Sequence, residues 1–134
     1  MSALVSILFP EPTLQRTPLS VLGWWESRRL TYNAIVGGTG AITLLGLWVA
    51  SGFEFFLTPF PWIGAAAYGI AANVCYSLGA PVEILLQRWL KRDTYGLGPA
   101  LFRHGLVYSV GLTLFPLALA GLAVIARIVA TLLF

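Results

Sequence analysis

The chain has 134 residues, of which 58% are hydrophobic and 10% are charged, and its formal net charge is +3. Soluble domains carry about 25% charged residues, so this composition excludes an ordinary water-soluble fold. The single cysteine, Cys75, excludes an internal disulfide and a cysteine-based metal cluster.

Residues 1–30 are predicted to form a cytoplasmic segment, with an amphipathic helix at residues 13–30 lying in the membrane interface. Thr17 and Pro18 suit the start of that helix, as N-cap and first helical residue. An indole keeps one edge in water at the headgroup boundary, and a guanidinium can contact lipid phosphate. The predicted interfacial anchors are therefore Trp24, Trp25, Arg28 and Arg29. The segment serves either as a membrane anchor or as a docking platform for a partner subunit.

Residues 31–134 are predicted to form one all-α, polytopic transmembrane domain. Its three helices span about residues 31–57, 62–86 and 105–127, since roughly 20 apolar residues cross a bilayer. Seven of the eight lysines and arginines fall on one side of this arrangement: Arg16, Arg28, Arg29, Arg88, Lys91, Arg92 and Arg103. For a multi-pass protein of a bacterial cytoplasmic (inner) membrane, the positive-inside rule then predicts the N-terminus in the cytoplasm and the C-terminus outside.

The third apolar stretch is longer than a span requires. As one helix, residues 105–134 would extend about 45 Å, against a hydrocarbon core of about 30 Å. Pro116 lies inside the stretch and removes a backbone donor. One alternative is a kinked and tilted helix whose last turns leave the membrane, and the other is a span that ends near Arg127, followed by an interfacial tail. We favour the first alternative.

Small residues form a face on each predicted span. Close packing through such faces drives helix association in lipid, where apolar side chains alone do not. Three helices cannot easily bury this many small faces among themselves, so the surplus predicts contacts with other membrane subunits or self-association. The most regular faces are Gly37-Gly38-Thr39-Gly40-Ala41, Ala65-xxx-Gly69-xxx-Asn73 and Gly105-xxx-Ser109-xxx-Thr113.

A few polar residues lie where polarity is costly, and each is a candidate for a functional site. Glu83 follows a kink expected at Pro81, and a neutralising partner at the same depth would offset the cost of its carboxylate. The sequence predicts a polar clamp in which Glu83 pairs with Arg103 or His104. The alternative is a proton-relay or ligand site. The candidate residues are Asn33, Asn73, Tyr76, Glu83, Arg103 and His104.

Asn73 is predicted to lie deeper, near the centre of the second span. A buried amide needs a hydrogen-bond partner, and Thr43 of the first span or Thr113 of the third could provide one. The alternative is contact with a substrate in a pore, which would require oligomerisation because three short spans hardly enclose a channel.

Two segments carry a resemblance: RRLTYN at residues 28–33 and ANVCYSLGAPVE at residues 72–83. Together they resemble a group of small, uncharacterised bacterial integral membrane proteins with an RRLxYN-like opening of the first span and an ANxxYxLGxxxE-like second helix. The resemblance covers about residues 24–120 and implies no activity. It matches Asn33, Asn73, Tyr76 and Glu83 to the group's polar positions, which is compatible with an internal clamp.

These features predict a small accessory or scaffold subunit of a larger membrane assembly, acting through helix–helix contacts. The alternatives are a homo-oligomeric carrier or channel, and a lipid or quinone binder. We expect no enzymatic activity, because the sequence holds no nucleophile motif, metal cluster or suitably spaced carboxylate pair. No cofactor is predicted, although a bound lipid is compatible with the interfacial segment. Nucleic-acid binding is not expected, since topology explains the cations.

Overall fold

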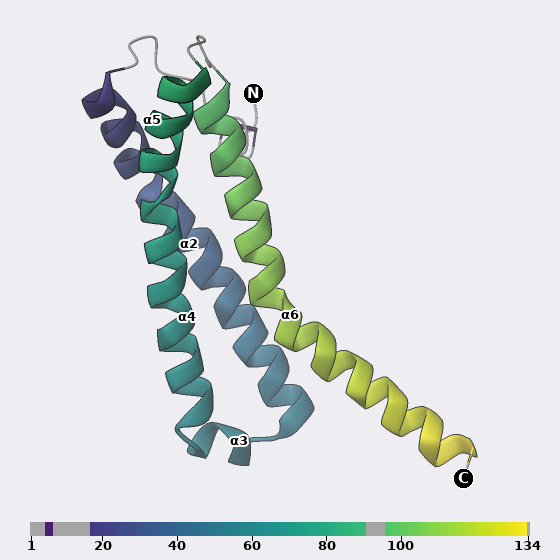
Figure 1. The fold of residues 1–134 in the computed structure, drawn as a ribbon. Helices are drawn as coiled ribbons and strands as arrows, with labels where there is room; N and C mark the ends of the chain where they lie inside the picture. The colour runs from purple at the N-terminus through teal and green to yellow at the C-terminus, as the bar shows by residue number, and fades with distance from the viewer. Residues whose placement is uncertain (1–4, 7–16, 91–95, 134) are drawn as a thin grey trace.

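The computed structural model describes residues 5–6, 17–90 and 96–133, and these residues contain helices and no strand. The main elements are α2 (Pro18–Ser51), α3 (Glu54–Leu57), α4 (Phe60–Ser77), α5 (Gly79–Leu90) and α6 (Leu97–Leu133) (Figure 1). The stretches Pro18–Ser51, Phe60–Leu90 and Leu97–Leu133 are each long and apolar enough to cross a membrane. The prediction of an all-α membrane protein with three spanning helices is confirmed.

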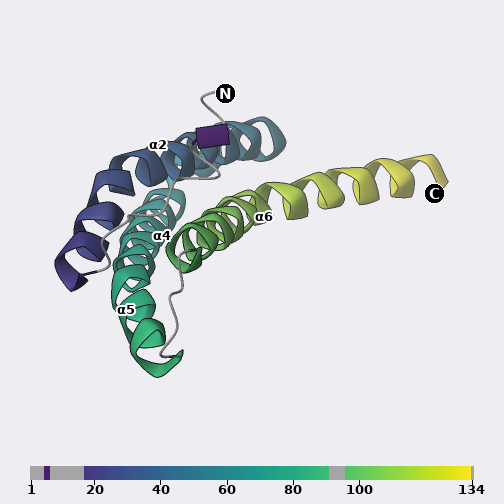
Figure 2. The same ribbon diagram turned by 90° about the horizontal axis from the view of Figure 1, so that it is seen from above.

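Helix α2 is continuous from the predicted interfacial segment into the first span. The Thr17 side chain accepts a hydrogen bond from the Ser20 backbone N–H (3.2 Å), and Pro18 occupies the first turn. The helix ends at Gly52, whose φ of 80° favours glycine. Residues 24–36 contain no proline or glycine, so nothing in the sequence breaks the helix where the interfacial segment was expected to end. Its 34 residues extend about 51 Å, and Figure 2 shows that it curves.

The second span consists of α4 and α5, which meet at Leu78. The sequence predicts a kink at Pro81, and the break lies three residues earlier because a proline affects the preceding turn. Pro81 has no N–H to donate to the Ser77 carbonyl, and its ring crowds that carbonyl. At the break, the Leu78 N–H is shared between the carbonyls of Val74 and Cys75, at 3.2 Å each.

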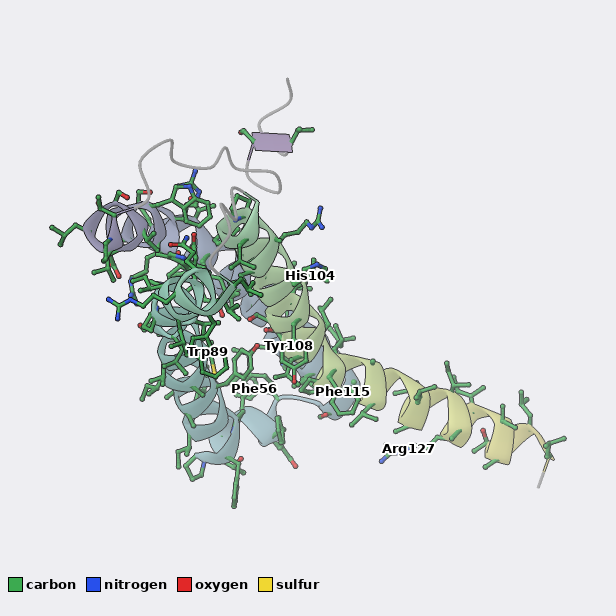
Figure 3. The ribbon with its side chains drawn as sticks, turned by 45° about the horizontal axis from the view of Figure 1, so that its top comes forward. Phe56, Trp89, His104, Tyr108, Phe115 and Arg127 are labelled. Carbon is green, nitrogen blue, oxygen red and sulfur yellow. The ribbon has the colours of Figure 1, made fainter. Side chains whose placement is uncertain are left out.

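Helix α6 runs beside α2 and then leaves the bundle. Its 37 residues include Pro116 and would extend about 55 Å if straight. Figure 1 shows that α6 changes direction about halfway along, and that its C-terminal end lies at the level of α3; Figure 3 labels Phe115 beside this bend. The helix continues past Arg127 to Leu133, beyond the boundary near residue 127 that the sequence predicts for the span.

The core is an aromatic cluster at the end of the bundle away from α3. The Trp25 and Tyr76 rings meet edge to face at 5.3 Å, and the Tyr32 and Tyr76 rings lie 4.5 Å apart. Trp24 and Trp25 are only 7% and 5% exposed. The two indoles therefore pack inside the bundle, which differs from the predicted interfacial anchoring. The buried members of the cluster are Val21, Trp24, Trp25, Tyr32, Val36, Tyr76, Ala80, Phe102 and Leu106.

Candidate functional site

Glu83 is buried where α5 meets α2, with 4% of its surface exposed. The Trp25 indole Nε1–H donates to its Oε2 at 2.8 Å, and the Gln87 amide donates to its Oε1 at 3.1 Å. One donor comes from α2 and the other from the next turn of α5. The carboxylate is thus held by two neutral donors, which compensate part of the cost of burying it.

Two glycines allow the helices to approach this carboxylate closely. A Cβ added at Gly79 would collide with the six-membered ring of the Trp25 indole, and one added at Gly98 would collide with the carboxyl group of Glu83. Neither glycine has a positive φ. Each position therefore favours glycine because there is no room for a side chain, and not because the backbone is unusual. Close backbone approach at small residues is a usual means of helix association in membranes.

A series of hydrogen bonds continues from this site along the bundle. The Tyr76 hydroxyl donates to the Trp25 carbonyl (2.6 Å), and the hydroxyls of Tyr32 and Ser109 share a hydrogen bond (2.8 Å). The Tyr68 hydroxyl then donates to the Ser109 carbonyl (2.8 Å). These bonds join α2, α4 and α6 at successive levels, so the polar groups act as interhelical contacts.

The series ends with a pair of threonines. The Thr113 hydroxyl donates to the Tyr68 hydroxyl (2.8 Å), and the Thr43 hydroxyl donates to the Thr113 carbonyl (2.9 Å). Both threonines are buried. Asn73 was predicted to bond with one of these two residues, but its amide donates to the Gly69 carbonyl of its own helix at 3.1 Å. The prediction was therefore wrong about this bond, because the Thr43 hydroxyl bonds to the Thr113 carbonyl and the Thr113 hydroxyl bonds to Tyr68.

The two predicted cationic anchors lie at the same end of the bundle. Arg29 forms a bidentate ion pair with Glu26 (2.6 and 2.8 Å), and its guanidinium also donates to the Ser77 hydroxyl at 3.2 Å. The Arg28 guanidinium lies 4.0 Å from the centre of the Trp24 ring, a cation–π contact. Both guanidiniums thus combine contacts within the protein with partial exposure.

The remaining clamp candidates do not all meet. Tyr76 and Glu83 both contact Trp25, whereas His104 is exposed and lies on the side of α6 away from α4 and α5 (Figure 3). Phe102 occupies the inner face of α6, and a residue two positions later points about 200° away. Arg103 is half-buried. The predicted pairing of Glu83 with His104 is not formed, since their side chains lie on different faces.

Sequence reasoning missed Trp25 as the donor to Glu83. The signal was present, because an indole has one N–H that needs a partner when it is buried. The same amphipathic ring also suits a membrane interface, and residue order alone does not distinguish between these environments.

A groove of about 700 Å³ separates α2 from α4, with α6 on its third side. Its walls are mostly small or apolar, and both asparagines of the chain line it. Phe55 of α3 and Pro61 in the first turn of α4 line it as well. A volume of this size falls within the range of about 300–1,000 Å³ found for small-molecule sites. The walls also include Val36, Gly37, Gly40, Ala41, Thr43, Leu44, Leu47, Gly64, Ala65, Tyr68, Gly69, Ala72, Leu112, Thr113 and Pro116.

Comparison with known proteins gives no family: no family model, curated protein or solved structure matches the chain. Among the described residues, no three His, Cys, Asp or Glu side chains group in a way that could hold a metal ion. The resemblance carried by residues 28–33 and 72–83 stays a prediction.

Proposed function

We propose that this protein is a small, non-catalytic accessory subunit that packs against a helix of another membrane protein. The observation that supports this best is the C-terminal arm, defined as residues 117–133 of α6. After the bend at Pro116 the arm diverges from the other helices (Figure 1). Most of its side chains are exposed, among them Leu122 at 63% and Leu132 at 79%. The arm thus offers a membrane-embedded helix with most of its surface free for a partner.

The arm has two different faces. From residue 120 to 131, at 3.6 residues per turn, one face of about 120° carries four alanines and Arg127. The opposite face carries Ile125, Ile128 and Val129. Alanines allow two helix backbones to approach closely, whereas large side chains interact with lipid about equally well. The alanines are Ala120, Ala123, Ala126 and Ala130.

Arg127 indicates what the partner carries. Within the described part of the chain its side chain forms no hydrogen bond or ion pair, and Figure 3 shows it extending below the arm. An arginine in a membrane segment is usually paired or extends to the headgroups. The proposed partner is therefore a membrane helix with a small-residue face and a carboxylate near the level of Arg127.

The test is site-specific photo-crosslinking in intact cells. A photoreactive residue placed at Ala123 or Ala130 should crosslink to one partner subunit, which mass spectrometry identifies. The same residue at Ile125 or Ile128, on the opposite face, is the matched control and should crosslink much less. Arg127→Ala should reduce the yield from the alanine face. Equal crosslinking from both faces, or crosslinking only to lipid, would reject the proposal.

A second candidate function is that of a homo-oligomer, and one observation favours it. Glu54 on α3 is exposed and makes no ion pair within the described residues, and the end of the arm lies at the same level as α3 (Figure 1). The arm of one copy could therefore place Arg127 against Glu54 of another. In that case the crosslinks would join identical chains. The charge exchange Glu54→Arg with Arg127→Glu should then restore crosslinking that each single substitution removes.

We further propose that the protein lies in a bacterial cytoplasmic membrane with the Glu83 end of the bundle in the cytoplasm. The support is the distribution of cations, since Arg28, Arg29, Arg88 and Arg103 accompany the Glu83 end and Arg127 lies near the other. Reporter fusions test the orientation. Alkaline phosphatase should be active when fused after Leu57 and inactive when fused after Leu90, and the reverse result would invert it.

A further inference from the structure

The two asparagines line the same groove with much of their hydrogen-bonding capacity unused. A primary amide has two N–H donors and one carbonyl acceptor. Within the described residues the Asn33 side chain makes no hydrogen bond, and the Asn73 side chain makes only its bond to the Gly69 carbonyl. Unmet polar groups are costly where water is scarce. A ligand with a carbonyl or hydroxyl group would satisfy these amides.

The two amides also lie at one level. The Arg29–Ser77 hydrogen bond joins α2 and α4 near the groove, and the two helices run in opposite directions (Figure 1). Asn33 lies four residues beyond Arg29, and Asn73 lies four residues before Ser77. Each amide is thus one helical turn, about 6 Å, further into the bundle than that contact. This places them as a pair near one end of the groove.

The charge of the groove favours an uncharged ligand. Every residue that lines it is neutral. Arg29 lies one turn before Asn33 on α2, and its guanidinium already holds Glu26 through two hydrogen bonds and contacts Ser77. A phosphate-bearing lipid headgroup would have to compete with the Glu26 carboxylate for that cation. An uncharged head would bind the amides without disturbing the ion pair.

The length of the groove favours a long apolar tail. Its wall on α2 extends from Asn33 to Leu47, 14 residues or about 21 Å of helix. One leaflet contributes half of a hydrocarbon core of about 30 Å, or roughly 15 Å. A helix tilt of about 20° changes this comparison little. The groove is therefore longer than a single leaflet and can hold an extended apolar tail that reaches past the middle of the bilayer.

From these features we propose that the groove between α2 and α4 binds an isoprenoid quinone. The quinone carbonyls accept hydrogen bonds from the Asn33 and Asn73 amides, and the tail lies along the small and apolar walls towards Phe55 and Pro61. This site is separate from the C-terminal arm. A failure of the partner proposal therefore leaves the quinone proposal standing, and the reverse also holds.

The experiment measures ubiquinone-10 bound to the full-length chain. The protein is placed in phosphatidylcholine nanodiscs that contain ubiquinone-10, then repurified in mild detergent, and the quinone and phospholipid retained per chain are quantified by mass spectrometry. Gly37→Leu and Gly69→Leu are designed to fill the groove, since an added Cβ at either position meets no atom within 4 Å. Gly111→Leu is the matched control, because it has the same open space but lies outside the groove.

The wild-type chain should retain close to one ubiquinone per protomer. The groove-filling variants should lose it, and the Gly111→Leu control should keep it. The double variant Asn33→Leu with Asn73→Leu tests the amides without relying on the glycine substitutions. It should weaken the affinity for ubiquinone by about 5- to 150-fold, as expected for the loss of two hydrogen bonds, and so lower the amount retained. Equal retention by all variants, retention of phospholipid in place of quinone, or crosslinking of groove residues to another helix would overturn the proposal.

Discussion

The contact between Gly79 and the Trp25 indole gives the sharpest test of the core. In Gly79→Ala, the new methyl group would overlap three carbon atoms of the six-membered ring of Trp25. The ring has little room to move, because its Nε1–H is bonded to Glu83 and its faces and edges contact Trp24 and Tyr76. The substitution therefore forces either the indole or α5 to shift.

The expected magnitude follows from two opposing terms. Overpacking a well-packed core costs about 1–3 kcal/mol. Alanine gains about 0.5–1 kcal/mol over glycine in a helix, because glycine loses more backbone entropy. The free energy of unfolding should therefore fall by about 1–2 kcal/mol in Gly79→Ala. Gly111→Ala meets no neighbouring atom, so it has only the favourable term and should be neutral or slightly stabilising.

The assay is unfolding by SDS in mixed micelles, followed by tryptophan fluorescence with the buried Trp24 as a core probe. A double-mutant cycle identifies the contact, because Trp25→Phe removes the ring atoms that the new methyl group would overlap. The double variant Trp25→Phe with Gly79→Ala should then be more stable than the sum of the single changes predicts, by about 1–3 kcal/mol. Strictly additive effects, or equal shifts in Gly79→Ala and Gly111→Ala, would refute the reasoning.

Two further predictions use the same unfolding assay. Glu83→Ala should lower the free energy of unfolding by about 1–3 kcal/mol, because the buried Trp25 indole N–H loses its acceptor; Glu83→Gln keeps a carbonyl oxygen there and should retain most of the stability. Thr43→Val should cost about 0.6 kcal/mol through loss of the bond to the Thr113 carbonyl. Thr39→Val should cost less, since that hydroxyl bonds within its own helix, and equal losses from Thr43→Val and Thr39→Val would argue against the interhelical bond.

The fold class was readable from the sequence because the bilayer sets the length of a spanning helix. Three apolar stretches of sufficient length, separated by Pro- and Gly-containing connections, leave few alternatives. Pro81 also indicated the break in the second span, although the break lies at Leu78. These features depend on the order of residues along each helix, which the sequence gives directly.

The rotation of each helix was harder to predict. His104 and Glu83 were expected at one depth, but contact also requires that both side chains face the same neighbour, and His104 faces outward. For Trp25, an amphipathic ring suits both a headgroup region and a core that holds a carboxylate. For Asn73, the amide could bond either across helices or to the carbonyl four residues earlier. Spacing alone does not decide such choices, because their energies are similar.

The position of the last interhelical contact explains why the bundle opens towards α3. Lipid tails are as apolar as leucine, so these helices stay together where hydrogen bonds or close glycine contacts hold them. Within the described residues, the hydrogen bonds that join α2 to α6 end at Thr43 and Thr113. Gly46 packs tightly against Leu117 just beyond them. Pro116 lies between Thr113 and Leu117, at the point where these contacts run out, and α6 bends away there. The same bend separates the C-terminal arm from the bundle. The groove lies between α2, α4 and α6, and α4 faces it mainly with glycine and alanine.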